Sequence, residues 1–153
     1  MLLKNRNSHF EMTVIDYEFP EVHDDRYDSN WLIIEIRATR AKDSWSASYP
    51  CMLTGELAEL ADWLDAVADG KNATLQLGFF EPNLHFEVTE SAPKKLCVYI
   101  DAELKPAGVL GDDSGIDDPI RIEFELIPAE LKDAAISLRT YLRAFPIRAT
   151  SAE

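Results

Sequence analysis

The chain has few of the residue types from which catalytic and metal centres are built. Its 153 residues include two cysteines and three histidines, and His9, His23 and His85 lie on separate segments without the spacing of metal ligands. The six glycines form no phosphate-binding loop of the G-x-x-x-x-G-K-S/T or G-x-G-x-x-G type, and no G-x-S-x-G turn. We therefore expect no catalytic residue, no cofactor and no metal site.

Long apolar segments are also absent. No run approaches the ~20 apolar residues that span a bilayer, and the segment 1–6 lacks the apolar core of a signal peptide. This argues against a membrane role and predicts a cytoplasmic protein. Apolar residues still make up 46% of the chain and charged residues 28%, which is typical of a folded globular protein. The length fits a single domain, residues 1–153, with an ordered core over about 9–148.

The two cysteines, Cys51 and Cys97, both lie in apolar sequence surroundings. Unpaired cysteine behaves as a small hydrophobe, and a cytoplasmic location disfavours a disulfide. We expect two buried free thiols, although the sequence by itself leaves pairing open.

Basic residues are scarce relative to acidic ones. There are 15 Lys and Arg against 28 Asp and Glu, a net charge of −13, and residues 51–118 carry 14 of the acids with only four bases. A field of this sign repels phosphate backbones, so direct nucleic-acid binding is not expected. It would attract a basic protein and speed its encounter. Alternatively, the excess of acidic residues serves only to keep the protein soluble.

Alternation of apolar and polar residues predicts about seven strands, and helical spacing predicts two helices. The first helix is expected from an N-cap at Thr54 to Gly70, with Leu57, Leu60 and Leu64 on its apolar stripe. The second begins near Pro128 and ends before Pro146. The predicted strands are 9–15, 31–39, 45–49, 74–80, 84–88, 96–100 and 120–126.

This order of elements lacks the regular strand–helix alternation of parallel folds. Three strands precede the first helix and four separate it from the second. The sequence therefore predicts an α+β protein, with an antiparallel sheet or sandwich and two packed amphipathic helices.

Carboxylates gather in three segments that are candidates for binding a basic partner. One precedes the strand at 31–39, a second is the outer face of the first helix, and the third is a loop before the last strand. In that third loop an EF-hand would need an oxygen ligand and a glycine where Ile116 and Asp117 stand, so calcium is not expected. Trp63 lies beside the apolar stripe of the first helix. Packing against the core is the favoured interpretation for it, and half-exposure, which would suit a partner anchor, is the alternative. The candidate partner-binding residues are Glu21, Asp24, Asp25, Asp28, Asp62, Trp63, Asp65, Asp112, Asp113, Asp117 and Asp118.

Several short motifs also occur in a characteristic order along the chain. They are Asp25-x-Tyr27-Asp28-x-Asn30-Trp31-Leu32, Trp45-Ser46-Ala47, Pro50-Cys51-Met52-Leu53-Thr54, Glu81-Pro82-Asn83-Leu84-x-Phe86-Glu87 and Leu142-x-x-Phe145-Pro146. Together they resemble the WapI-like family of bacterial immunity proteins, from about Phe10 to Arg148.

The resemblance implies a non-enzymatic antitoxin. The family's namesake protects a cell against a contact-delivered toxin with a tRNA-cleaving domain, so the implied partner is a cognate toxin domain with a basic surface. Two other functions stay open. One is an acidic structural or regulatory interaction domain of unknown partner. The other is an enzyme with carboxylate acid–base chemistry, for which Asp24 and Asp25 are a poor pair because neighbours on a strand point to opposite faces.

Overall fold

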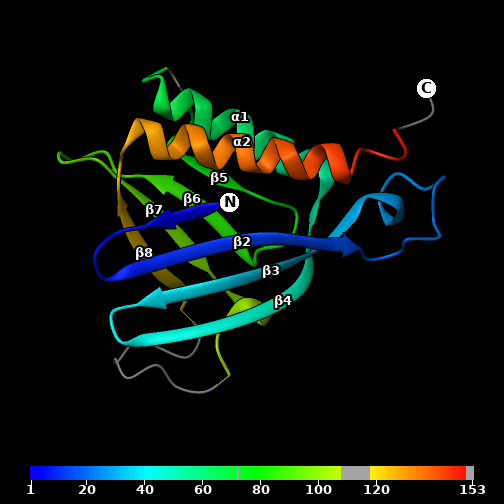
Figure 1. The fold of residues 1–153 in the computed structure, drawn as a ribbon, viewed down its shortest axis with the longest axis horizontal. Coiled ribbons are helices and arrows are strands. Elements are labelled where there is room, and N and C mark those ends of the chain that lie inside the picture. The colour runs from blue at the N-terminus through cyan, green and yellow to red at the C-terminus, as the bar shows by residue number, and fades with distance from the viewer. Residues whose placement is uncertain (72, 108–117, 151–153) are drawn as a thin grey trace.

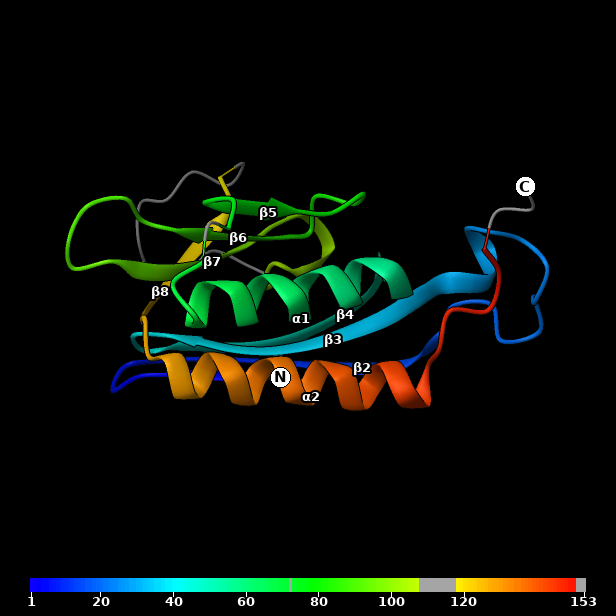
Figure 2. The same cartoon turned by 90° about the horizontal axis from the view of Figure 1, so that it is seen from above.

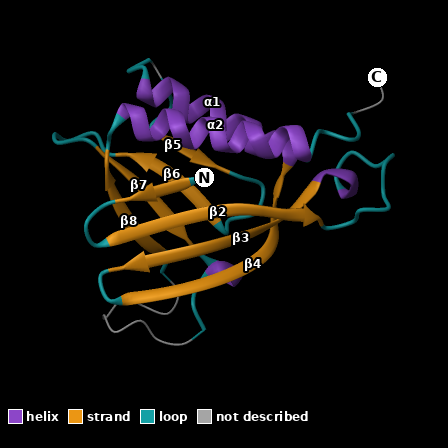
Figure 3. Cartoon of the chain, viewed as in Figure 1, coloured by secondary structure: helices purple, strands orange, loops and turns teal. Residues whose placement is uncertain are grey.

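The computed structural model describes residues 1–71, 73–107 and 118–150. This part of the chain forms two four-stranded antiparallel sheets and two α-helices (Figure 1; Figure 3). The first sheet has the order β1-β2-β3-β4 and the second β5-β6-β7-β8. The first sheet consists of β1 (Leu2–Lys4), β2 (Ser8–Tyr17), β3 (Trp31–Arg40) and β4 (Asp43–Leu53). The second consists of β5 (Gln76–Gly78), β6 (Leu84–Val88), β7 (Lys95–Ile100) and β8 (Ile120–Glu125).

The two sheets share one hydrophobic core, which a helix pair closes at one end. The ring of Phe10 on β2 meets that of Phe86 on β6 edge to face, with centroids 6.2 Å apart. Helices α1 (Thr54–Ala68) and α2 (Pro128–Ala144) lie side by side across the same end of both sheets (Figure 2). Trp63 of α1 reaches into the core, where its ring is 6.4 Å from that of Phe86. The predicted α+β architecture is confirmed.

The alternation of apolar and polar residues and the helical spacing correctly predict which faces of β3 and α1 are buried. On β3, Leu32, Ile34 and Ile36 are fully buried, and Ala38 nearly so. The intervening residues face outward, as expected for a strand with one face on the core. On α1 the stripe that includes Leu57, Leu60 and Leu64 is buried as predicted.

The described residues form eight strands instead of about seven. The additional strand, β1, is only three residues long and pairs with β2 in the register Leu3↔Phe10. So short a segment carries no recognisable alternation. The third predicted strand extends further than expected, to Leu53, and the predicted strand at 74–80 is shorter, covering Gln76–Gly78.

The start of α1 also differs from the prediction. Leu53, not Thr54, is the N-cap residue, and Thr54 is the first helical residue. The Thr54 hydroxyl donates to the backbone carbonyl of Asn30, 3.2 Å away. Glu56 accepts from the Leu53 backbone N–H at 2.9 Å, which supplies the acidic half of a capping box. At the other end Gly70 adopts φ +64°, the left-handed conformation expected of a helix-terminating glycine.

The cysteines are as expected. Cys51 and Cys97 are free and buried. Burial raises the pKa of the Cys51 thiol to about 12, so this group stays protonated and serves as a small apolar side chain.

Candidate partner-binding surface

The loop between β2 and β3 projects beyond the sheets and is fastened to the segment that follows α2 (Figure 1). Arg148 donates from Nη1 to the backbone carbonyls of Pro20 and Val22, at 2.8 and 3.2 Å. Asn30 donates from Nδ2 to the carbonyls of Arg26 and Ala149, both at 2.9 Å. The loop therefore has a defined conformation although it lies outside the sheets.

The four loop carboxylates from the sequence analysis are all exposed, but they do not have equal roles. The side chain of Asp25 accepts from the backbone N–H groups of Tyr27 and Asp28, at 2.7 and 2.8 Å. It stabilises the short 3-10 helix Asp28–Asn30. Glu21, Asp24 and Asp28 form no side-chain hydrogen bond or ion pair with the described residues, so their carboxylates are available to a partner.

Beside this loop lies a group of three rings, here called the aromatic patch: the exposed Tyr27 and Phe80 and the half-buried Trp31. Phe80 is 68% exposed and Tyr27 46%. The Phe80 ring centroid is 6.3 Å from that of Tyr27 and 6.0 Å from that of Trp31. Three rings from two distant segments thus meet at the surface, where a soluble protein usually exposes apolar residues singly.

The position of Phe80 is fixed by α1. Its backbone N–H donates to Oε1 of Glu56 at 2.5 Å, while the other carboxylate oxygen holds the N-terminus of the helix. Burial raises the pKa of Glu56; its two backbone hydrogen bonds oppose the rise, and the charges of Glu59 and Glu81 add to it. Glu56 is therefore a structural residue that places Phe80 at the surface.

Asp28 and three further carboxylates lie near the patch and are here called the carboxylate rim: Glu18, Asp28, Glu59 and Glu81. Asp28 and Glu81 follow Tyr27 and Phe80 directly in sequence. The backbone of Glu18 is hydrogen-bonded to that of Trp31 at 2.8 Å, and Glu59 lines the same groove as Tyr27. Burial and then the charge of Asp28 raise the pKa of Glu18. Within the described residues no rim carboxylate forms an ion pair.

The carboxylates on the outer face of α1 are used differently. Arg139 of α2 contacts Asp62 at 2.9 Å and Asp65 at 2.6 Å. Lys132 contacts Asp65 at 3.4 Å and Asp69 at 2.8 Å. The acidic face expected on α1 thus exists, but basic groups of α2 neutralise most of it, and it joins the two helices.

These ion pairs predict a pH-dependent contribution to stability. Burial alone would raise the pKa of Asp65, but the hydrogen bonds and charges of Arg139 and Lys132 outweigh it and hold the pKa below its usual value. Arg139→Ala should lower the Tm by roughly 2–4 °C at pH 7, the scale of a partly exposed ion pair. A carboxyl group whose pKa is lowered in the folded state stabilises the protein fully above the unfolded pKa near 3.9. The difference in Tm between the two proteins should therefore shrink below about pH 4 and vanish as the pH falls through the lowered pKa of Asp65.

The measurement is a thermal melt of both proteins from about pH 7 to about pH 2.5, which brackets the carboxyl titration. Arg143→Ala is the matched control, because Arg143 lies on the same helix and bonds only the hydroxyl of Thr140 among the described residues. A difference that stays constant across this pH range would show that Arg139 does not act through the carboxylates.

The remaining predicted residues lie elsewhere. Trp63 is only 6% exposed and donates from its indole N–H to the carbonyl of Thr74 at 2.7 Å. It is therefore packed, and its alternative role as a half-exposed partner anchor is wrong. The turn around Thr74 covers the edge of the helical stripe. Asp118 is exposed just before β8. The start of β8 lies at the end of the sheet away from the helices (Figure 1). Asp112, Asp113 and Asp117 lie outside the described residues. The predicted carboxylates that the structure describes therefore form no single patch.

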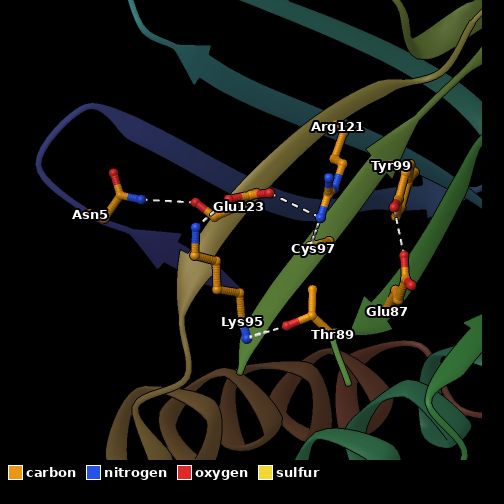
Figure 4. Close-up of polar contacts among 8 residues, drawn as sticks. All are labelled: Asn5, Glu87, Thr89, Lys95, Cys97, Tyr99, Arg121 and Glu123. Carbon is orange, nitrogen blue, oxygen red and sulfur yellow. Dashed lines mark hydrogen bonds and ion pairs between the residues drawn. The ribbon is translucent and has the colours of Figure 1, made fainter. Parts of the chain in front are cut away.

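The outward face of the second sheet carries a separate polar network (Figure 4). Glu123 pairs with Lys95 at 2.6 Å and with Arg121 at 2.9 Å, and Arg121 also donates to the sulfur of Cys97. The Tyr99 hydroxyl donates to Glu87 at 2.5 Å. Each charged group drawn in this network has a neighbour within the sheet that satisfies it.

This network is not suited to acid–base chemistry at neutral pH. Burial and then the hydrogen bond to Glu87 raise the pKa of Tyr99 to about 12. Burial also raises the pKa of the Cys97 thiol, against the influence of Arg121. Both groups are therefore protonated, and neither is an activated nucleophile or base. In the described part of the chain no three His, Cys, Asp or Glu side chains are grouped so as to hold a metal ion.

The aromatic patch was not predicted, although the adjacent Phe79 and Phe80 indicate an exposed ring. Phe79 and Phe80 are adjacent in a segment that alternates, so only one of them can face the core. Phe79 packs inward, with its ring 6.1 Å from that of Phe86, and Phe80 is left outside. Glu59 and Glu81 were missed because nothing in the sequence brings them next to Tyr27.

In the described residues, two facing antiparallel sheets closed by a helix pair define a small α+β protein. No helix in the described residues is long and apolar enough to cross a membrane. Comparison with known families then gives a particular assignment. The chain belongs to the immunity protein WapI-like family, whose model matches residues 1–146.

Membership confirms the resemblance seen in the motifs. It assigns the chain a general role as a non-enzymatic immunity protein that neutralises a toxin. No curated protein and no solved structure matches the chain.

Proposed function

We propose that the protein neutralises a cognate, basic toxin domain by binding it through acidic surface. The observation that carries the proposal is the contrast between two sets of carboxylates. Asp62, Asp65 and Asp69, in and directly after α1, are paired with α2. The rim, which includes Glu59 of α1, and the loop residues Glu21 and Asp24 have no cationic partner among the described residues. An excess of unpaired carboxylates at one end of a chain with net charge −13 attracts a basic protein.

The physical reason is clearest for a toxin that cleaves nucleic acid. Such a domain needs a basic surface to hold phosphates. An inhibitor that presents carboxylates can cover that surface, and electrostatic steering speeds its binding before the toxin reaches its substrate. Binding alone then blocks the toxin, without any catalytic group on the inhibitor.

The direct experiment is co-expression with the C-terminal domain of the large toxin encoded beside the gene. Growth should be rescued, and the two chains should co-purify as a stoichiometric complex. The association rate should fall steeply as salt is raised, because steering is screened. A complex whose association rate does not change with salt would contradict the basic partner, and absence of both rescue and complex would contradict the cognate pairing.

Loop charge makes a specific contribution that can be measured. The triple variant Glu21→Gln, Asp24→Asn, Asp28→Asn should lower the association rate about tenfold at low salt and flatten its salt dependence. Asp25 is left intact because it holds the loop. The control Glu90→Gln, Asp133→Asn, Glu125→Gln removes the same number of exposed charges elsewhere. Equal rates in the two variants, measured by stopped flow, would remove the loop from the binding surface.

A further inference from the structure

We propose that the aromatic patch, with the carboxylate rim near it, is the docking surface for the basic partner, and that Phe80 is its central anchor. This inference rests on the proposed function and names the surface through which it acts. The partner it fits has an apolar centre bordered by arginine or lysine side chains.

The backbone that carries the patch is held in place while its rings stay at the surface. Phe80 is 68% exposed, yet its backbone is held by Glu56 and its neighbour Phe79 is packed in the core. Tyr27 is equally fixed, since its backbone N–H is bonded to the side chain of Asp25 at 2.7 Å. Rings that are already ordered lose little conformational entropy when a partner covers them. Large aromatic side chains of this kind are the residues that most often dominate protein interfaces.

The charge of the carboxylate rim is complementary to that of a basic partner. A rim of unpaired carboxylates near an apolar centre matches a basic surface, because the centre is desolvated while the ion pairs form at its border. Arginine suits both parts, since its guanidinium stacks on rings and binds carboxylates through two hydrogen bonds. The rings of this chain already accept such contacts: the guanidinium of Arg26 lies 5.4 Å from the centre of the Tyr27 ring.

Two other charged surfaces are already neutralised within the protein. Arg139 and Lys132 neutralise the outer face of α1, and Arg121 and Lys95 balance Glu123 on the second sheet. Ile136 on α2 is 59% exposed but makes no aromatic contact among the described residues. In the aromatic patch, apolar exposure and unpaired charge coincide.

The test is calorimetric titration with a catalytically inactive form of the cognate toxin domain. The double variant Tyr27→Ser, Phe80→Ser should weaken binding by roughly 100-fold or more. Ile136→Ser is the matched control, because Ile136 is 59% exposed and remote from the rim in sequence, and it should bind within about threefold of wild type. If the double variant is not folded by circular dichroism, Phe80→Arg alone replaces it and should also abolish tight binding through charge repulsion.

The rim is tested separately by Glu59→Gln with Glu81→Gln, which should weaken binding about tenfold and reduce its salt dependence. Wild-type affinity in the aromatic variants, with normal binding by the unmodified protein, would overturn the docking surface and leave the proposed function standing. No binding by the unmodified protein would contradict the proposed function instead. In that case NMR titration with a hepta-arginine peptide decides the surface: amide shifts centred on 27, 31 and 80 support it, and shifts centred elsewhere overturn it.

Discussion

Phe86→Ala should lower the free energy of unfolding by about 3–5 kcal/mol, the largest single effect we expect in this protein. Phe86 is fully buried, and its ring contacts those of Phe10, Trp63 and Phe79 at centroid distances of 6.2, 6.4 and 6.1 Å. These rings come from both sheets and from α1. Truncation therefore leaves a cavity at the point where all three layers meet. Because small proteins are stable by only about 5–15 kcal/mol, the loss is a large fraction of the total.

The measurement is guanidinium denaturation followed by tryptophan fluorescence, with linear extrapolation to water. Phe80→Ala is the matched control, because it removes the same kind of side chain from the surface of the same sheet region. Its effect should lie within about 0.5 kcal/mol of zero. A loss of less than about 1 kcal/mol for Phe86→Ala would mean that the sheets do not pack against each other through this ring.

Much of this fold could be predicted because its period-two and helical patterns are local properties of the sequence. Leu32, Ile34 and Ile36 identify the buried face of β3 without knowledge of any other strand. The positions of the helices followed in the same way from Pro128, Gly70 and their apolar stripes. β1 was missed because three residues show no period.

The candidate partner-binding surface could be predicted only in part, because it depends on contacts between segments that are distant in the sequence. An acidic face on α1 is visible in the sequence, but its neutralisation requires that Lys132 and Arg139 of α2 lie alongside Asp65. The half-exposed alternative for Trp63 could not be dismissed from the sequence for the same reason, since the segment that contacts its indole N–H, at Thr74, follows the helix. The net charge predicts that a partner would be basic, whereas tertiary packing decides which carboxylates of this chain remain unpaired.

Asn30→Asp should destabilise the protein by about 2–3 kcal/mol and release the loop that carries Tyr27. Asn30 is 5% exposed and joins two segments far apart in the chain. Its Nδ2 donates to the carbonyls of Arg26 and Ala149, and its Oδ1 accepts from the backbone N–H of Arg148 at 2.9 Å. Aspartate has nearly the same shape but donates nothing, so two carbonyls lose their partner and face a carboxylate.

Comparison of the stabilities of Asn30→Asp and Asn30→Ala separates the donor role of Asn30 from its acceptor role. The alanine variant loses all three hydrogen bonds, whereas the aspartate variant keeps the oxygen that accepts from Arg148 but adds repulsion between oxygens. If Asn30 acts as a donor, Asn30→Asp should be at least as destabilising as Asn30→Ala in denaturant titration. Hydrogen exchange of the Arg148 amide should accelerate more in the alanine variant, because only there is its acceptor removed. A nearly neutral aspartate variant would mean that Asn30 fills space and that the loop is held by Arg148 alone.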